Sequence, residues 1–268
     1  MSSKDDYRQA PIGVFDSGVG GISVLRHIHA ALPGEHLIYC ADSRHAPYGS
    51  KTPQAIQQRA HYLTDFLLSQ GAKALVIACN TATAAAVAML RERYAVPIVG
   101  MEPAVKPAAA ATQTGVVGVL ATSGTLASSQ FAALLENYGH DIRVVTQACH
   151  GLVECIERGE LGSDATRRLL ARYVAPLLEA GADTIVLGCT HYPFVRSQIE
   201  ELAGPGVTLI DTGAAVARQL QQRLQSAGLQ ADAAAGGSVR FWSNGPMPQA
   251  AAVIAGLWGT GAEIDALP

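Results

Sequence analysis

The chain has 268 residues, enough for one large domain or two of ordinary size. Hydrophobic residues make up 49% and charged residues only 15%, which is typical of a globular protein, and the net charge of −3 without a basic run argues against nucleic-acid and membrane-surface partners. Residues 1–10 include two acids and no apolar core, and no apolar run approaches the length of a membrane helix, so we expect a cytoplasmic protein without a signal peptide or membrane span.

A glycine-rich turn follows the first predicted strand. Residues 11–15 predict that strand, residues 16–21 (DSGVGG) the turn, and the next residues an amphipathic helix. Such a turn brings backbone amides close to a ligand, and the helix N-terminus favours negative charge there. A dinucleotide-binding turn is the alternative, because the next predicted strand, 36–41, ends at an acidic residue. Against it, Ser23 occupies the third glycine position and Asp16 would face the pyrophosphate.

The loop at 43–51 follows the second predicted strand and contains a Pro-Tyr-Gly turn. Loops after parallel strands overhang the edge of the sheet where ligands bind, so Tyr48 and Gly49 are candidate binding residues. An ordinary surface turn is the alternative. The spacing of apolar residues then predicts a helix at 53–69.

The chain contains one stretch twice. Residues 71–81 and 181–191 align without a gap at a spacing of 110 residues (189 minus 79), and each copy has a glycine, a short apolar run and a cysteine. The pattern predicts two buried parallel strands that each deliver a thiol, Cys79 or Cys189, to the carboxyl end where open α/β sheets bind ligands. Core filling would explain either cysteine alone, but not their matched positions.

The repeat extends to the neighbouring elements. The strand and turn predicted at 115–125 match those at the start of the chain, and the strand at 207–211 matches the one at 96–100. We therefore predict an α/β protein with two similar flavodoxin-like domains, each a doubly wound and mostly parallel sheet. The active site is expected in the cleft between them.

The crossover points follow from the same alignment. We expect residues 1–103 plus 212–268 to form the domain with Cys79, and residues 104–211 to form the domain with Cys189. The remaining predicted elements are helices at 82–91, 151–157, 165–179, 214–227 and 249–257, a helix that starts near 192, a strand at 238–243, and a flexible Ala/Gly-rich connection at 228–237.

Other uses of cysteine fit the sequence poorly. An odd number of five cysteines in a long chain without a secretion signal argues against a disulfide framework. A zinc site would need closely spaced ligands, and Cys149-His150 with Cys155 is the nearest approach, so we predict no metal site.

Two thiols that face each other can act as a base and an acid. A thiol has a pKa of about 8.5, which a helix N-terminus or a nearby cation lowers, and two neighbouring thiolates repel, so the pair should share one proton. A thiolate on one face of a carbon can remove a proton while a thiol on the other face returns one. That reaction inverts a stereocentre.

Pyridoxal phosphate is the common electron sink for such a proton transfer, and it needs a Schiff-base lysine. The four lysines are Lys4, Lys51, Lys73 and Lys106, and none lies at a predicted strand end that faces the crevice. We therefore expect no cofactor. Deprotonation would then depend on positioning, desolvation and stabilisation of a carboxylate by amides and hydroxyls.

Four segments, taken together and in this order, resemble the signature segments of the bacterial glutamate racemases: 15–21, 47–49, 79–82 and 187–193. The resemblance covers nearly the whole chain. It implies a two-domain aspartate/glutamate racemase fold and cofactor-independent interconversion of L- and D-glutamate, which supplies D-glutamate for peptidoglycan. It also implies a homodimer.

The resemblance implies roles for individual residues. Cys79 would act on the D enantiomer and Cys189 on the L enantiomer, with Asp16, His191 and Glu154 assisting. The positions that match substrate contacts are Asp16, Ser17, Tyr48, Gly49, Asn80, Thr81, Thr190 and His191. Helix capping stays an alternative for Asn80, Thr81 and His191, and compensation of a helix dipole for Glu154.

Other functions remain open at this stage. A racemase for aspartate or a hydantoin would use the same two-cysteine logic. A two-domain cleft with helix N-termini aimed inward could also bind an amino acid without reacting with it.

Overall fold

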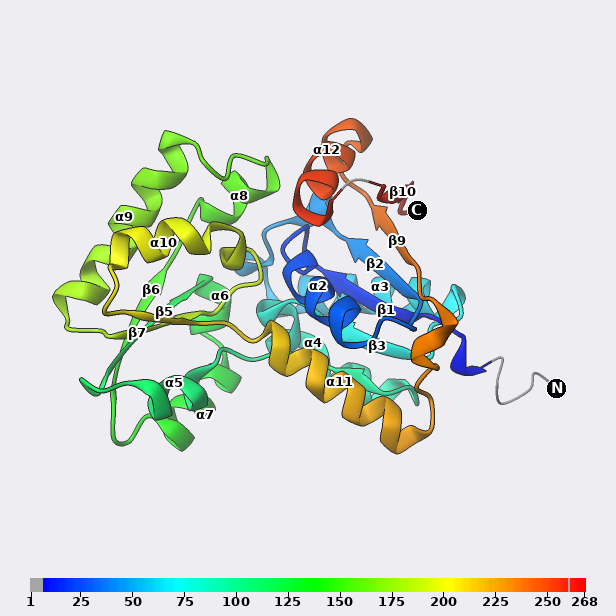
Figure 1. Ribbon diagram of the computed structural model, residues 1–268, viewed down its shortest axis with the longest axis horizontal. Helices are drawn as coiled ribbons and strands as arrows, with labels where there is room; N and C mark the ends of the chain where they lie inside the picture. Colours follow the sequence, from blue (N-terminus) through cyan, green and yellow to red (C-terminus); the bar gives the residue numbers. More distant parts are fainter. Residues whose placement is uncertain (1–6, 260) are drawn as a thin grey trace.

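The computed structural model describes residues 7–259 and 261–268, which form two lobes, each built on its own sheet (Figure 1). The first lobe has six strands in the order β10-β9-β2-β1-β3-β4, and the second has four in the order β6-β5-β7-β8. All of the pairings between these strands are parallel. The order β6-β5-β7-β8 repeats the order β2-β1-β3-β4, so the predicted α/β fold with two similar parallel sheets is confirmed.

The first lobe contains most of the elements predicted near the two ends of the chain. Its elements are β1 (Ile12–Asp16), α2 (Ile22–Ala31), β2 (Leu37–Ala41), η1 (Ser43–His45), η2 (Tyr48–Ser50), α3 (Pro53–Ser69), β3 (Ala74–Ile77), α4 (Asn80–Arg93), β4 (Ile98–Val99), α11 (Gly213–Ala227), η4 (Ala233–Ala235), β9 (Val239–Ser243), α12 (Met247–Trp258) and β10 (Glu263–Ala266).

The second lobe contains the middle of the chain. Its elements are α5 (Val105–Ala111), β5 (Val116–Ala121), α6 (Ser123–Leu126), α7 (Ser129–Tyr138), β6 (Arg143–Ala148), α8 (Leu152–Glu157), α9 (Asp164–Glu179), β7 (Thr184–Leu187), η3 (Tyr192–Val195), α10 (Arg196–Ala203) and β8 (Thr208–Ile210).

Helices cover both faces of each sheet. In the first lobe, α2, α11 and α12 pack on one face and α3 and α4 on the other. In the second lobe, α8, α9 and α10 pack on one face and α5 and α7 on the other (Figure 1). Because central strands of this kind are buried on both faces, β3 and β7 are short continuous apolar runs in which each residue is buried.

The division into two domains stays a proposal, and the membership of the strands supports it. The chain leaves the first sheet after β4 and returns to that lobe at α11. Both crossings lie beside the proposed boundaries at 103–104 and 211–212.

One prediction about the first lobe is wrong. The connection at 228–237 is not loose, because Ala231 is buried and its N–H donates to Glu35 Oε1 at 2.8 Å. Glu35 is itself buried and paired with Lys73 at 2.5 Å, so this connection is fixed to the interior of the lobe. Composition alone suggested flexibility, but a hydrogen bond to a buried charge orders the segment.

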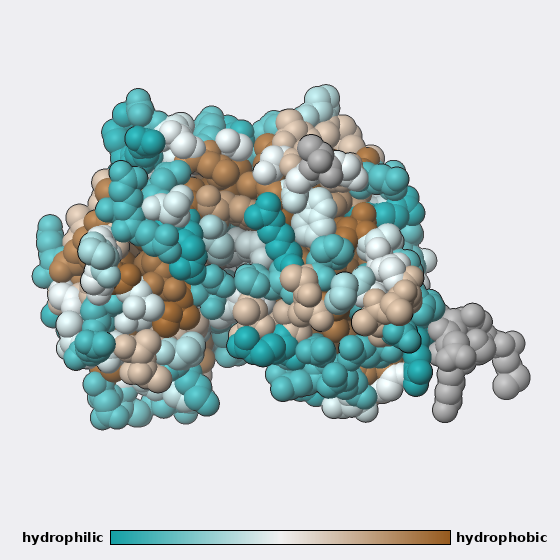
Figure 2. All heavy atoms as spheres, in the orientation of Figure 1, coloured by the Kyte–Doolittle hydropathy of each residue, from teal (hydrophilic) through white to brown (hydrophobic). Residues whose placement is uncertain are grey.

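Figure 2 shows hydrophilic and hydrophobic residues mixed over both lobes on the side that it presents, with the hydrophobic ones in separate patches. Over residues 7–259 and 261–268, no helix combines the length and the apolar character that crossing a bilayer requires.

Candidate active site

The glycine-rich turn after β1 packs against side chains of the second lobe. A Cβ on Gly18 would lie 1.9 Å from Glu157 Oε1, and a Cβ on Gly20 would lie 2.3 Å from His191 Nδ1. Only glycine therefore permits this approach. The space that a pyrophosphate would need is filled by Glu157 and His191, so the dinucleotide alternative does not fit the structure.

Cys79 lies at the junction between β3 and α4. It occupies the N-cap position of α4, where its sulfur accepts from Ala82 N–H at 3.4 Å. Helix capping, the alternative for Asn80 and Thr81, is therefore wrong. The Cys79 thiol also donates to Ser17 Oγ at 3.8 Å. Burial, together with the nearby Asp16 carboxylate, raises the pKa of Cys79 well above its usual value despite the helix N-terminus, which favours the thiol form.

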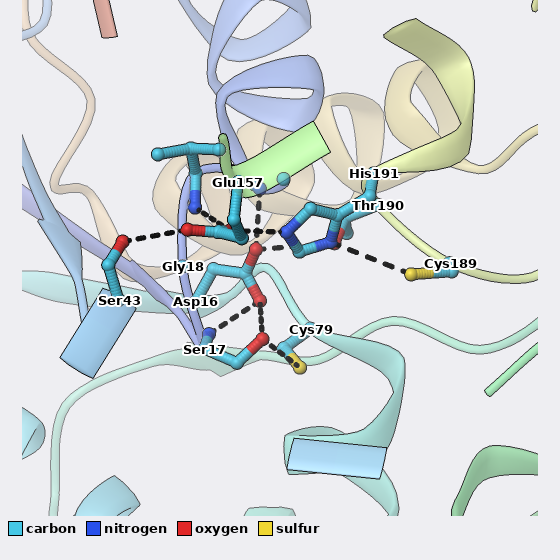
Figure 3. Close-up of polar contacts among 12 residues, drawn as sticks. Asp16, Ser17, Gly18, Ser43, Cys79, Glu157, Cys189, Thr190 and His191 are labelled. Carbon is cyan, nitrogen blue, oxygen red and sulfur yellow. Dashed lines mark hydrogen bonds and ion pairs between the residues drawn. The ribbon is translucent and has the colours of Figure 1, made fainter. Parts of the chain in front are cut away.

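Asp16 lies behind Ser17. One carboxylate oxygen accepts from Ser17 N–H at 2.6 Å and from Ser17 Oγ–H at 3.1 Å, and the other accepts from Gly21 N–H at 2.7 Å and Thr190 Oγ–H at 3.3 Å. Burial raises the pKa of Asp16, while His191 opposes that shift. Ser17 thus connects Asp16 to Cys79, and Thr190 connects Asp16 to the second lobe (Figure 3).

Cys189 follows β7 in the same way that Cys79 follows β3. Its sulfur lies 3.6 Å from His191 Nδ1, and His191 Nε2 lies 2.6 Å from Glu157 Oε1. Burial alone would lower the pKa of His191, but the hydrogen bonds to Cys189 and Glu157 outweigh it and raise the pKa well above its usual value. The imidazolium form therefore donates to both neighbours.

His191 does not cap a helix. It precedes η3, but its side chain makes no capping hydrogen bond and points instead toward Cys189 and Glu157 (Figure 3). The capping alternative for His191 is therefore wrong.

Glu157, which the sequence reasoning missed, holds His191. Glu154 was predicted for this role, but it lies one helical turn earlier on α8 and lines a neighbouring pocket with His150 and Gly151. Among the described residues, no hydrogen bond joins Glu154 to His191 or Cys189. A catalytic role for Glu154 stays a prediction without a contact to support it.

The two thiols border one cavity between the lobes. Its free volume is about 10 Å³, which is room for about one water molecule. The lining residues are Ser17, Pro47, Tyr48, Gly49, Cys79, Asn80 and Thr81 from the first lobe, and Thr122, Thr125, Val153, Gly188, Cys189, Thr190 and His191 from the second. The structure thus brings together all of the predicted site residues except Asp16, which lies behind the lining, and Glu154.

Polar groups around the cavity differ in how many hydrogen bonds they already make within the protein. The Asn80 side chain is buried, and neither of its polar atoms has a hydrogen-bond partner among the described residues. A buried amide without partners is costly unless a ligand or water satisfies it. Thr81 Oγ instead lies 2.8 Å from Thr122 Oγ and 3.1 Å from Thr125 Oγ, which joins the two lobes beside the cavity.

The Tyr48-Gly49 turn lines the cavity. The Tyr48 hydroxyl is not free, because it donates to Asp42 Oδ2 at 2.5 Å. Asp42 is fully buried and also accepts two hydrogen bonds from Arg59, at 2.9 and 2.8 Å, and one from Asn244. These contacts hold the Tyr48 side chain, and with it the turn, in place.

Replacement of Arg59 by Met is expected to destabilise the fold by about 2 kcal/mol, because it removes the arginine that pairs with the buried Asp42 carboxylate. A fully buried pair would lose more, but the Arg59 side chain is 23% exposed. Burial alone would raise the pKa of Asp42, yet hydrogen bonds from Arg59 and Tyr48 hold it below its usual 3.8.

A carboxylate with a depressed pKa stabilises the fold above its unfolded pKa, and the effect is lost as the pH falls through its folded pKa. The difference between wild type and Arg59→Met should therefore be largest at pH 7 and shrink below about pH 4. Urea denaturation at both pH values measures it. An equal difference at the two pH values would contradict the assignment to Asp42.

The other predictions about cysteine can be compared with the structure directly. All five cysteines are buried and free, so the alternative of a disulfide framework is wrong. Over the described residues, His, Cys, Asp and Glu side chains do not gather into a group that could hold a metal ion.

The geometry as a whole supports acid and base chemistry on one small substrate. Two thiols from two lobes border one cavity, each with its own partner: Ser17 beside Cys79, and His191 beside Cys189 (Figure 3). The Asn80 amide, which has no hydrogen-bond partner among the described residues, lines the same cavity with several Ser and Thr hydroxyls. Such groups can donate hydrogen bonds to a carboxylate ligand.

Comparison with known proteins agrees with this geometry. The family model described as Asp/Glu/Hydantoin racemase matches residues 12–220. A glutamate racemase of Ectopseudomonas mendocina (strain ymp) is 60% identical over 257 residues, which cover 96% of this chain and 97% of that protein. A glutamate racemase of Methylococcus capsulatus is 56% identical over 248 residues, which cover 92% of each chain.

Solved structures give the same result. Glutamate racemase isoform RacE1 of Bacillus anthracis superposes with a TM-score of 0.87 at 31% identity and covers 97% of this chain and 98% of its own. Escherichia coli glutamate racemase in complex with L-glutamate and the activator UDP-MurNAc-Ala has a TM-score of 0.85 at 32% identity, with coverage of 96% and 98%. The Francisella tularensis enzyme in complex with D-glutamate has a TM-score of 0.83 at 28% identity, with coverage of 97% and 98%.

Proposed function

This chain belongs to the Asp/Glu/hydantoin racemase family and is an isomerase, and we propose that it interconverts L- and D-glutamate by a two-base mechanism without a cofactor. The observation that supports this most directly is the shared cavity between Cys79 and Cys189. The choice of glutamate rests on relatives that are named glutamate racemase and are up to 61% identical to this chain.

The proposed reaction moves one proton at each sulfur. With L-glutamate, the Cys189 thiolate removes the Cα proton, and the electron pair is delocalised into the α-carboxylate. The Cys79 thiol then donates its proton to the opposite face of Cα, which gives D-glutamate. The enzyme is left with a thiol at Cys189 and a thiolate at Cys79, the state required for the reverse reaction. The raised pKa of Cys79 suits it to the donor role in the first direction.

Neighbouring residues would stabilise the charges in this reaction. We assign the substrate ammonium to the Asp16-Ser17 side and the α-carboxylate to Asn80, Thr81 and Thr190. Neither polar atom of the Asn80 side chain has a hydrogen-bond partner in the part of the chain that the structure describes, which supports this assignment. The side-chain carboxylate would bind to the backbone amides of the Tyr48-Gly49 turn, because the Tyr48 hydroxyl is already bonded to Asp42.

Substrate entry requires the lobes to separate. A cavity with room for about one water cannot admit glutamate, so the arrangement corresponds to a closed state. Closure around the substrate would exclude water and strengthen the electrostatic interactions at Cα.

Purified protein supplied with L-glutamate alone is expected to produce a racemic mixture, which circular dichroism follows in real time. In heavy water the product should contain one deuterium at Cα, because the proton donor exchanges with solvent. A substrate panel with aspartate and a hydantoin tests the other members of the family. Binding of glutamate without isotope exchange would favour a binding protein and contradict the proposal.

The cellular role follows as a further part of the proposal. D-Glutamate made in the cytoplasm would supply peptidoglycan synthesis and so maintain the cell wall and cell shape. Assembly as a homodimer stays a prediction.

A further inference from the structure

The carboxylate that holds His191 is itself held by the other lobe. Glu157 is on α8 of the second lobe, but of its three hydrogen-bond donors among the described residues, two come from the first lobe. Val19 N–H donates to Oε1 at 2.7 Å, and Ser43 Oγ–H donates to Oε2 at 2.9 Å (Figure 3). The third donor is His191 at 2.6 Å.

Ser43 is fixed in place by the residue before it. It begins η1, directly after the buried Asp42 at the end of β2. Asp42 anchors this point of the chain through its hydrogen bonds to Arg59, Tyr48 and Asn244. These hydrogen bonds hold the backbone next to Ser43 in place, and the Ser43 hydroxyl donates from this position to Glu157 in the other lobe.

The contact depends on lobe closure. Gly18 allows the first lobe to approach Glu157 so closely that a Cβ there would overlap the carboxylate. When the lobes separate for substrate entry, Glu157 must lose the donors from Val19 and Ser43 and keep only His191, which belongs to its own lobe. The hydrogen bonds around Glu157 thus differ between the open and closed states.

We propose that Ser43 is a positioning residue that, together with Val19 N–H, fixes Glu157 and His191 beside Cys189 only when the lobes are closed. Lobe closure then completes the proton-transfer group on the Cys189 side. Asp16, behind Cys79, also accepts a hydrogen bond across the lobes, from Thr190 at 3.3 Å, but its shorter hydrogen bonds from Ser17 and Gly21 come from its own lobe and do not depend on closure. This proposal rests on the proposed racemase function. It goes beyond that function in stating that the proton transfer at Cys189 depends on closure of the two lobes.

Replacement of Ser43 by Ala tests the proposal in the whole enzyme. Loss of a hydrogen bond to a charged group should lower kcat/KM by about tenfold. The two enantiomers have equal free energies, so this fall must be equal in both directions and cannot show which transfer is affected. Substrates deuterated at Cα can show it.

The isotope effect on kcat/KM for each enantiomer reports how far removal of its Cα proton limits the rate. In Ser43→Ala, transfer at Cys189 should become more rate-limiting. The isotope effect should therefore rise for L-glutamate, whose proton Cys189 removes, and fall for D-glutamate, whose proton Cys79 removes. A merely structural defect would lower activity and leave both isotope effects at the wild-type values.

Two further variants serve as controls. Ser43→Thr keeps the hydroxyl and should restore most of the activity and the wild-type isotope effects. Ser69→Ala removes an exposed hydroxyl at the end of α3 that donates to Phe66 O, and should leave both unchanged. Full activity of Ser43→Ala, or isotope effects that move together, would overturn the inference. Absence of racemisation in the wild type would instead remove the proposed function.

Discussion

Replacement of either Cys79 or Cys189 by Ser is expected to reduce racemisation by about a thousandfold or more. A hydroxyl is a much weaker acid than a thiol, so Ser can neither form the anion that removes the Cα proton nor donate a proton as readily, and general acid–base catalysis contributes about 10²–10⁴. Both cysteines are buried and line one cavity, one from each lobe. Circular dichroism with each enantiomer measures the loss.

Isotope exchange separates the two cysteines. In heavy water, Cys189→Ser should still exchange the Cα proton of D-glutamate through Cys79, without inversion, and should not exchange that of L-glutamate. Cys79→Ser should show the reverse. Cys155→Ser, a buried cysteine that contacts Arg158 rather than the cavity, is the matched control and should keep near-normal activity. Wild-type rates in either active-site variant would refute the two-base proposal.

The sequence repeat predicted the central feature of both lobes because the feature is local. A glycine, four fully buried residues and a cysteine occur in the same order around β3 and β7, and Gly71 and Gly181 both have positive φ, at +83° and +88°. Short apolar runs of this kind identify central parallel strands. The position of each thiol at a strand end then follows from the chain itself.

Edge strands were harder to predict. The sequence reasoning did not identify β6 or β10, and both lie at the edge of a sheet. Their residues are mostly half-buried or exposed, so they lack the continuous apolar run that marks β3 and β7. β6 pairs with β5, and β10 pairs with β9, but the apolar pattern of β6 and β10 themselves does not indicate this pairing.

The choice between Glu154 and Glu157 could not be made from the sequence. Both acids are on α8, three residues apart, and helix geometry places them on nearly the same side. Which one meets His191 depends on how α8 is oriented against the turn of the first lobe. Gly18 is the feature of the sequence that indicated a close contact at this turn. A glycine between a strand and a helix can allow the close approach of a side chain as well as of a phosphate.

Replacement of Gly18 by Ala is expected to lower kcat about a hundredfold, although it adds one methyl group. The new Cβ would lie 1.9 Å from Glu157 Oε1 and 2.5 Å from its Cδ, far inside contact distance. Gly18 does not have a positive φ, so alanine could adopt its backbone conformation and the effect should come from the collision alone. Glu157 must then move away from His191, and displacement of a catalytic group by about 1 Å can cost 10²-fold.

A second change tests whether the loss comes from the collision with Glu157. In a Glu157→Asp background the shorter side chain withdraws the carboxylate from the new methyl group, so Gly18→Ala should cost much less activity there than in the wild type. The control is Gly256→Ala on the exposed side of α12, where a Cβ meets nothing within 4 Å and alanine should add about 0.5–1 kcal/mol of stability. If Gly18→Ala kept activity within about twofold of wild type, the close approach of the turn to Glu157 would not be required for catalysis, and the account of why this turn is rich in glycine would be wrong.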